Sequence, residues 1–384
     1  MSLVICDTAN AGRTSLEWIP TEILEIIASN VPSLDTLWNL LRASPRCWRI
    51  FTLRYAHITE SVLSGSNSIT PLLVRELIRA VALVRAQNFP FPSLDILRWD
   101  FMTAIARNTN RDEYARCGDT TGITFGPNSL PDSRDVITSV VATAYHISVL
   151  AQSVLASCIK RLKRSNLNCL PPDPDPDPEP RPPYLSGVIE AMGQPTYLEE
   201  MRAVRALWII QLTGEVKAMV KSRPDVVRWT EDEVSRLSQK NPATILPYAA
   251  YHHVAVEVRT MMYYLPACYK NDTVFRLPQA PAPSECNRWA TMPSDSQSYD
   301  EWCLGNESYG GDLLSYGNST VSDRLPRLGF AFWEFARMYR LGLARGLPGL
   351  TLTTHYRHLV LQGICENTYL TVKTQSGDCS RAIF

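Results

Sequence analysis

Histidine and cysteine side chains are the first candidates for chemistry in this 384-residue sequence, because they can bind metals or form a nucleophile–base pair. The closest groupings are His252 with His253, and His355 with His358 followed by Cys365. If helical, His355 and His358 would share a face, but a zinc site needs more ligands at a recognisable spacing. We therefore interpret these histidines as structural or surface residues. A Cys–His pair brought together only by the fold stays open.

Other sequence patterns that carry enzyme chemistry are missing. The chain has no G-x-x-x-x-G-K-[ST], G-x-S-x-G, H-E-x-x-H or G-x-G-x-x-G, and no D-D-x-x-D run of the isoprenoid-synthase type. The acidic run at 171–183, PPDPDPDPEPRPP, lacks the glycine turn and the correctly spaced glutamate of a calcium loop. The sequence therefore predicts no catalytic residue, no metal and no cofactor, and it favours a function other than catalysis.

Composition narrows the range of partners and compartments. The formal net charge is zero, which gives no indication of nucleic acid or of an anionic membrane as a partner. The ten cysteines include no C-x-x-C pair, and the N-terminus lacks the charge and apolar length of a secretory signal. We expect reduced thiols and a cytoplasmic or nuclear protein. The three N-x-S/T sequons, at Asn271, Asn306 and Asn318, are then chance matches.

Apolar residues recur with helical spacing along most of the chain, which predicts an all-α fold with a large irregular helical domain and long loops. The chain is long enough for one large or two ordinary domains. No repeat of the leucine-rich, WD or kelch type is present. The expected helices span residues 68–86 (a surface helix with outward arginines), 93–106, 198–220, 248–265 and 328–345, and Thr230 with Glu233 has the spacing of a capping box.

The segment between Asp135 and Lys160 carries no formal charge and is long enough to cross a bilayer. Its many serine and threonine residues make it too polar for a typical span, so we predict one long buried helix. The basic run at 160–164, KRLKR, lies where the helix dipole favours positive charge. A nuclear-import signal is the alternative interpretation of this run.

Two segments interrupt the helical pattern. Alternating proline and acid at 171–183 cannot form a helix, so we expect a disordered loop at 165–184, either inside one domain or as a linker between two. Residues 266–325 are rich in turn formers with interspersed aromatics. This stretch is a candidate surface for recognising a protein substrate, or a lid whose aromatics pack on the helical core.

The stretch from 15 to 51 has the densest apolar pattern, and local chemistry divides it into three short helices. Pro20 suits the start of the first helix, which carries Ile23, Ile26 and Ile27 at helical spacing. Ser33 and Ser44 can cap the next two helices. A unit this small cannot bury all its large apolar groups, and Leu24 and Leu40 fall off the main stripes, so the surplus indicates an interface.

These residues resemble a known family. Ile-Pro-Thr-Glu-Ile-Leu at 19–24, Arg-Ala-Ser-Pro at 42–45 and Trp48, with leucines spaced between them, resemble an F-box, and most closely the F-box proteins of filamentous fungi. The resemblance covers about residues 15–60, between a flexible N-terminus at 1–14 and a helical domain at 61–384. It implies docking on the SKP-type adaptor of an SCF cullin–RING ubiquitin ligase and recruitment of an unknown protein substrate for ubiquitination.

The resemblance also implies which residues contact the adaptor. Ile19 stands where the family usually has leucine, which preserves volume and apolarity. The full set of implied contacts is Ile19, Pro20, Ile23, Leu24, Leu37, Leu40 and Trp48. The alternatives are an ordinary helical hairpin packed into the body of the protein, an interaction scaffold that works without a ligase, and an unrecognised helical enzyme.

Overall fold

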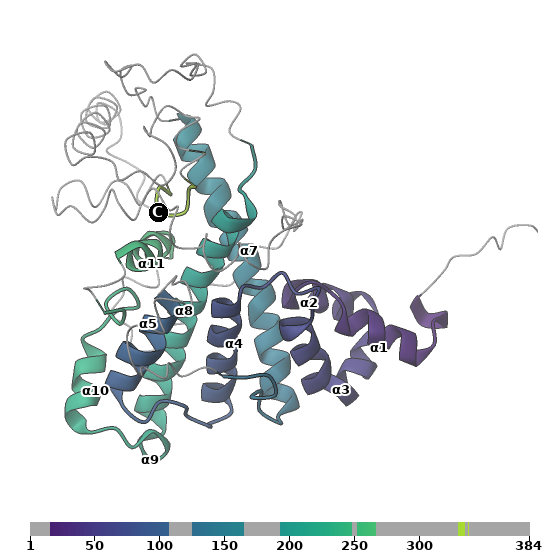
Figure 1. Cartoon of the computed structure of the whole chain (residues 1–384), viewed down its shortest axis with the longest axis horizontal. Coiled ribbons are helices and arrows are strands. Elements are labelled where there is room, and N and C mark those ends of the chain that lie inside the picture. Colours follow the sequence, from purple (N-terminus) through teal and green to yellow (C-terminus); the bar gives the residue numbers. More distant parts are fainter. Residues whose placement is uncertain are drawn as a thin grey trace, which may run out of the picture. The chain divides into compact units, whose positions relative to one another are not determined.

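The computed structural model describes residues 16–106, 125–164, 193–247, 252–265, 329–334 and 337. In these ranges the chain forms ten α-helices, a 3₁₀ turn and a π-helix, without any strand (Figure 1). The all-α prediction is confirmed for this part of the chain. The proline–acid segment 171–183, the aromatic-rich segment 266–325 and the residues His355, His358 and Cys365 lie outside the described residues.

The chain divides into two compact units. Unit 1 contains residues 1–70 and 126–146, and unit 2 contains residues 71–125 and 147–384. The expected boundary at residue 60 falls inside helix α3 (Pro45–Ser64), which continues because Ile58 and Val62 extend its buried apolar face. The unit that holds the F-box-like stretch is therefore larger than residues 15–60.

Unit 1 begins with the 3₁₀ turn η1 (Leu16–Trp18) and three helices, α1 (Thr21–Ser29), α2 (Leu34–Ala43) and α3. The three helices expected between 15 and 51 are therefore present. As the sequence predicts, the Ser44 hydroxyl caps α3 by accepting a hydrogen bond from the Cys47 amide at 3.3 Å. Both α1 and α2 pack on α3, with Leu24, Leu37, Leu41 and Phe51 buried between them.

Helix α3 is kinked at Arg54, whose backbone leaves the helical region with φ −130° and ψ 25°. Neither proline nor glycine lies at the bend. Two residues earlier, the Thr52 hydroxyl donates to the Trp48 carbonyl oxygen at 2.8 Å, and this kind of back-bonding bends helices. Leu53, next to the kink, is exposed.

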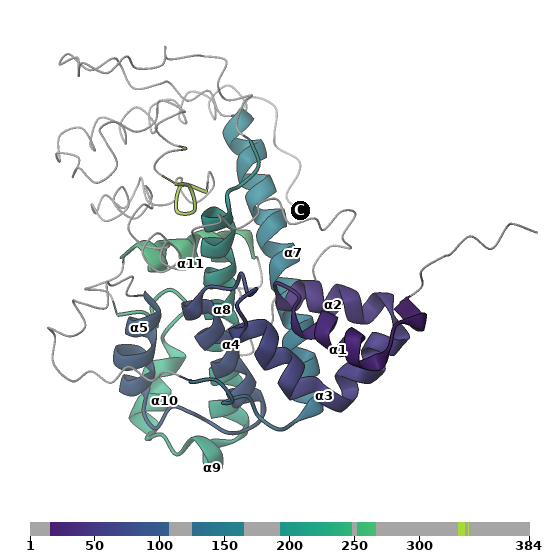
Figure 2. The same ribbon diagram turned by 45° about the vertical axis from the view of Figure 1, so that its right-hand side comes forward.

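Unit 2 is organised around the long helix α8, which is buried on nearly all sides. This helix packs on α4, α9, α10 and α11 (Figure 2). A helix surrounded in this way is apolar around its circumference, as the run from Ala206 to Ile210 is. The elements of this unit are α4 (Leu72–Arg85), η2 (Ile96–Met102, the π-helix), α5 (Thr103–Ala106), α8 (Tyr197–Ser222), α9 (Pro224–Val227), α10 (Glu231–Ser238) and α11 (His252–Tyr264).

Two sequence expectations for unit 2 need correction. Helix α4 is not a surface helix, because Arg79 is buried and pairs with Glu76 at 2.8 Å within the same helix. The segment expected to be helical from 328 begins instead with turns at 329–332, where Gly329 has a φ of +72°. A residue with positive φ interrupts a right-handed helix, which explains the difference.

The segment without formal charge forms helix α7 (Arg134–Arg164), one continuous helix as predicted. Its residues 134–146 belong to unit 1 and the remainder to unit 2. By length and composition alone α7 could cross a membrane, but a core helix passes the same test. Ile137, Val141, Ala151 and Leu155 are fully buried, as in a core helix.

Candidate functional site: an exposed apolar strip on unit 1

Helix α1 carries apolar residues on two sides, and only one side faces the core. Leu24 and Ala28, four residues apart, are buried against the rest of unit 1. Ile26 is 57% exposed and Ile23 is 46% exposed, and Ile27 is exposed beside them. The sequence analysis took these isoleucines as the main helical stripe and Leu24 as the residue outside it. The structure reverses that assignment.

Another exposed apolar residue, Trp18, lies just before α1 in the chain; it is 86% exposed and is the most exposed large apolar residue in the described ranges. Trp18 ends the turn η1, which is closed by a 3.3 Å hydrogen bond from the Ile19 amide to the Leu16 carbonyl oxygen. We define the α1 strip as Trp18, Ile23, Ile26 and Ile27. Apolar side chains gathered in this way on one short segment are typical of a surface that binds another protein.

The structure places the adaptor contacts implied by the resemblance in three environments. Leu24 and Leu37 are fully buried in the core of unit 1, so their side chains shape the unit rather than offer a surface. Ile19 and Leu40 are partly buried. Pro20, Ile23 and Trp48 are exposed and available for contact.

Trp48 is held on the α2 side of α3. Its ring centroid lies 5.9 Å from that of Trp38 in an edge-to-face arrangement, and 6.4 Å from that of Phe51. Trp48 therefore packs within unit 1 and also presents 38% of its surface to solvent. At the start of α3, the Arg46 guanidinium reaches α1 instead and donates to the Thr21 hydroxyl at 3.2 Å.

Sequence reasoning did not assign Trp18, Ile26 and Ile27 to the binding surface. A helical pattern with two apolar stripes identifies a helix but does not say which stripe faces inward. One signal was present, because Ala28 pairs with Leu24 at a spacing of four and a small residue suits a close helix contact. A second signal for the binding surface was the position of Trp18, which directly precedes the Ile19-Pro20 pair.

A separate groove of about 570 Å³ lies along the last turns of α3 in unit 1. Its polar lining includes His57, Glu60, Ser64 and Asn128. The Ser64 hydroxyl donates to a Glu60 carboxylate oxygen at 2.5 Å. No hydrogen bond between His57 and either residue is present in the described structure, so this serine is not paired with the histidine of the groove.

In unit 2 the most concentrated chemistry is a set of buried ion pairs on α8. Arg205 donates from Nη2 to Glu257 of α11 at 2.7 Å, and both side chains are fully buried. Burial raises the pKa of the Glu257 carboxyl, although Arg205 acts in the opposite direction. Burial likewise lowers the pKa of the neighbouring Arg202.

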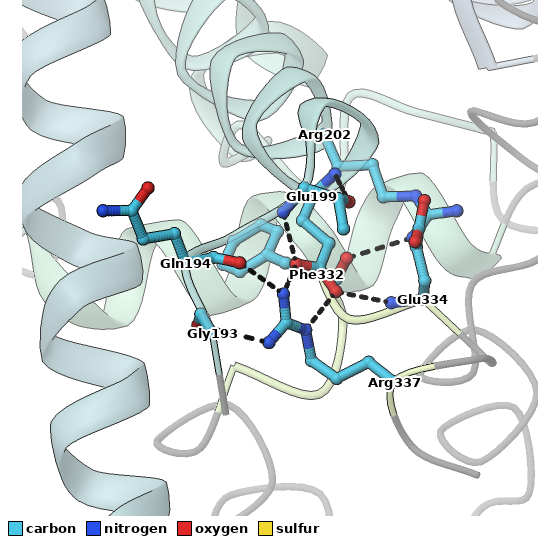
Figure 3. Close-up of polar contacts among 8 residues, drawn as sticks. Gly193, Gln194, Glu199, Arg202, Phe332, Glu334 and Arg337 are labelled. Carbon is cyan, nitrogen blue, oxygen red and sulfur yellow. Dashed lines mark hydrogen bonds and ion pairs between the residues drawn. The ribbon is translucent and has the colours of Figure 1, made fainter. Parts of the chain in front are cut away.

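In the first turn of α8, Glu199 forms a second buried ion pair, with Arg337 (Figure 3). The two Arg337–Glu199 contacts measure 2.6 and 2.7 Å, and Arg337 also donates to the Gln194 carbonyl oxygen at 2.8 Å. Arg202 donates to the Phe332 carbonyl oxygen at 3.0 Å, and the Glu334 amide donates to Glu199. These bonds fasten Phe332, Glu334 and Arg337 to the first turns of α8. Both carboxylates accept hydrogen bonds from arginines, and we interpret the network as structural.

The described cysteines also offer no reactive site. Cys47 and Cys158 are both buried and free. Burial raises the pKa of the Cys158 thiol to about 12, which keeps it protonated and unreactive. No group of three potential metal-ligating side chains occurs among the described residues. His252 and His253 fall within helix α11, but their side chains lie outside the described residues.

The basic run at 160–164 is part of α7, and Leu162 within it is buried. An import receptor that reads an extended basic peptide would first have to unwind this end of the helix. The run therefore fits the helix-dipole interpretation of the sequence better than the import-signal interpretation.

Comparison with known proteins adds no relative: no family model, no curated protein and no solved structure matches the chain.

Proposed function

We propose that unit 1 is an F-box module that docks through the α1 strip on the SKP-type adaptor of a cullin–RING ubiquitin ligase. In this proposal the chain is the substrate-receptor subunit and recruits an unknown protein substrate. The observation that carries the proposal is the exposure of Ile23 and Ile26 on a helix whose other apolar residues are already buried. The F-box-like residues of the sequence supply the identity of the partner.

The α1 strip suits a helix-in-groove contact. Ile23, Ile26 and Ile27 have the spacing of three and four residues with which a helix presents anchors to an apolar groove. Trp18 adds a large aromatic anchor at the N-terminal end. Truncating one central anchor of such an interface costs on the order of 2 kcal/mol of binding free energy.

A receptor of this kind performs no chemistry, in agreement with a network of buried charges that is already paired. It raises the effective concentration of a substrate near the ubiquitin-loaded enzyme, because two binding sites lie on one chain. The proposal involves no cofactor, no nucleic acid and no membrane, and it places the protein in the cytoplasm or the nucleus.

The test is the affinity of the purified SKP-type adaptor for the full chain and for the double variant Ile23→Ala/Ile26→Ala. Both substituted side chains are exposed, so the free energy of unfolding should change little. Leu24→Ala would be a poor choice, because Leu24 is fully buried and its truncation would leave a cavity. The matched control is Leu72→Ala, which removes an exposed apolar side chain from unit 2.

We expect the double variant to bind at least about tenfold more weakly than the wild-type chain, and Leu72→Ala to bind normally. Equal binding by all three proteins would exclude the α1 strip as the docking surface. If the chain bound the adaptor but recruited no cullin, the interaction-scaffold hypothesis would replace the proposed ligase function.

A further inference from the structure

Arg98 and Trp99, on the π-helix η2 of unit 2, form an exposed pair that the proposed function does not use. Leu97, Phe101 and Met102 of the same helix are buried, whereas Trp99 is 51% exposed. The guanidinium carbon of Arg98 lies 5.5 Å from the centroid of the Trp99 ring. Tryptophan and arginine are among the residues that contribute most to binding at protein interfaces. The pair is therefore a candidate contact for a partner.

Arg98 has donors that are available to a ligand. Its Nε donates to the Ile245 carbonyl oxygen at 3.2 Å, and this bond orients the side chain. Neither Nη group forms a hydrogen bond or an ion pair with the described residues, and neither is a buried atom without a partner, so both reach solvent. A guanidinium presents its donors as a planar fork that matches the two oxygens of a carboxylate. Arg98 can therefore bind a carboxylate through its Nη groups.

The charges around Arg98 favour an anionic ligand. Burial lowers the pKa of Arg98, Asp95 acts in the opposite direction, and Arg236 adds to the lowering. Asp95 is paired with Arg236, whose Nη1 lies 3.6 Å from an Asp95 carboxylate oxygen. Arg98 is thus a partly buried cation that has no counter-ion in direct contact among the described residues. An anion that binds its Nη groups would supply that counter-ion.

The neighbouring acids favour a single carboxylate over a polyanion. Arg236 pairs with Asp232 at 3.1 Å as well as with Asp95, so it lies between two acids. Both aspartates are exposed, and they repel a nucleic acid or an anionic membrane more strongly than one carboxylate. Trp99 offers an apolar ring surface beside the Arg98 fork. The ligand that fits both residues is a peptide with an acid next to an apolar side chain.

We propose that Arg98 and Trp99 form a docking site for a peptide segment of a partner protein, in which an aspartate or glutamate stands next to an apolar residue. The Nη groups of Arg98 bind the carboxylate, and the Trp99 ring packs against the apolar side chain. The site lies within unit 2, so this inference does not depend on the proposed docking of unit 1 or on the proposed ligase function.

The first test is a selection of random short peptides displayed on phage against the immobilised full chain. Phage that bind the Trp99→Ala chain are removed beforehand, so that the surviving peptides need Trp99. Because Trp99 is exposed, this variant should keep the fold of the wild type. We expect the survivors to carry an acidic residue next to an apolar one. Survivors without an acid would overturn the proposal, and so would a selection that leaves no survivors.

The second test measures whether the acid of a selected peptide contacts Arg98. Fluorescence anisotropy gives the affinity of that peptide, and of the same peptide with its acid changed to the amide, for the wild-type chain and for Arg98→Gln. On the wild type the amide peptide should bind at least about tenfold more weakly, whereas on Arg98→Gln the two peptides should bind equally. The matched control Arg259→Gln removes another exposed charge from unit 2 and should behave as the wild type. An equal loss on the wild type and on Arg98→Gln would overturn the proposal, because the acid would then contact another residue.

Discussion

The Arg205 guanidinium on α8 holds both carboxylate oxygens of Glu257 on α11, with Nη2 at 2.7 Å from one oxygen and 2.8 Å from the other. Both side chains are fully buried. Fifty-two residues separate them in the sequence, so the pair links two helices that are distant along the chain. Burying two charges has a large desolvation cost, which is recovered only while both partners are present.

This pairing predicts a large asymmetry between single and double substitutions. Glu257→Gln leaves the Arg205 charge buried without its counter-ion, and we expect it to lower the free energy of unfolding by about 3–5 kcal/mol. Replacing both residues, with Arg205→Met and Glu257→Leu, should recover most of that loss. Urea denaturation measures both effects. The comparison pair is the exposed Arg236–Asp232, where Asp232→Asn should cost no more than about 1 kcal/mol.

A second prediction concerns the attachment of residues 329–334 and 337. The Cβ that an alanine would add at Gly329 would lie only 2.8 Å from the Cys158 sulfur, so this segment covers the thiol closely. Arg337→Met removes the bonds to Glu199 and Gln194, and we expect the segment to detach more often and expose Cys158. Alkylation of Cys158, followed by peptide mass spectrometry at neutral pH, should then be at least about tenfold faster than in the wild type. The buried Cys47 of unit 1 is the internal control, and equal acceleration at both thiols would indicate global unfolding instead.

The capping box at the start of α10 gives a pH-dependent prediction. Glu233 accepts hydrogen bonds from the backbone amides of Thr230 and Leu94, which hold the pKa of its carboxyl below the usual 4.5. A carboxyl with a lowered folded-state pKa stabilises the fold above its unfolded pKa, and loses this contribution as pH falls through the folded value. Glu233→Gln should therefore destabilise the protein near neutral pH, and its difference from the wild type should shrink below about pH 4. Chemical denaturation at a series of pH values measures this, and a difference that does not depend on pH would contradict it.

The sequence predicted where the helices lie better than it predicted which of their side chains are buried. The caps at Ser44 and Thr230 were predictable, because capping depends on residues within one turn. The burial of Arg79 and Glu199 was not, since a helical pattern assigns charged residues to the surface. Glu199 is buried because it pairs with Arg337, 138 residues later in the chain. A local sequence pattern cannot predict a pairing between residues so far apart.

The same limit applies to the candidate site. Leu24 and Ile23 are neighbours on an amphipathic helix, and the sequence does not determine which of them points inward. Packing on α3 decides it, with Leu24 fully buried and Ile23 exposed. Of the adaptor contacts implied by the resemblance, Pro20, Ile23 and Trp48 are exposed, whereas Leu24 and Leu37 belong to the core. The adaptor itself stays a prediction from the sequence.

The most direct test of the proposed function is amide hydrogen exchange of the full chain with and without the purified SKP-type adaptor. The account predicts that adaptor slows exchange in peptides covering Trp18 to Ala28, the segment that carries the α1 strip, while α10 in unit 2 is unchanged. Protection confined to unit 2, or no protection in any part of the chain at saturating adaptor, would contradict the docking of unit 1 on this partner.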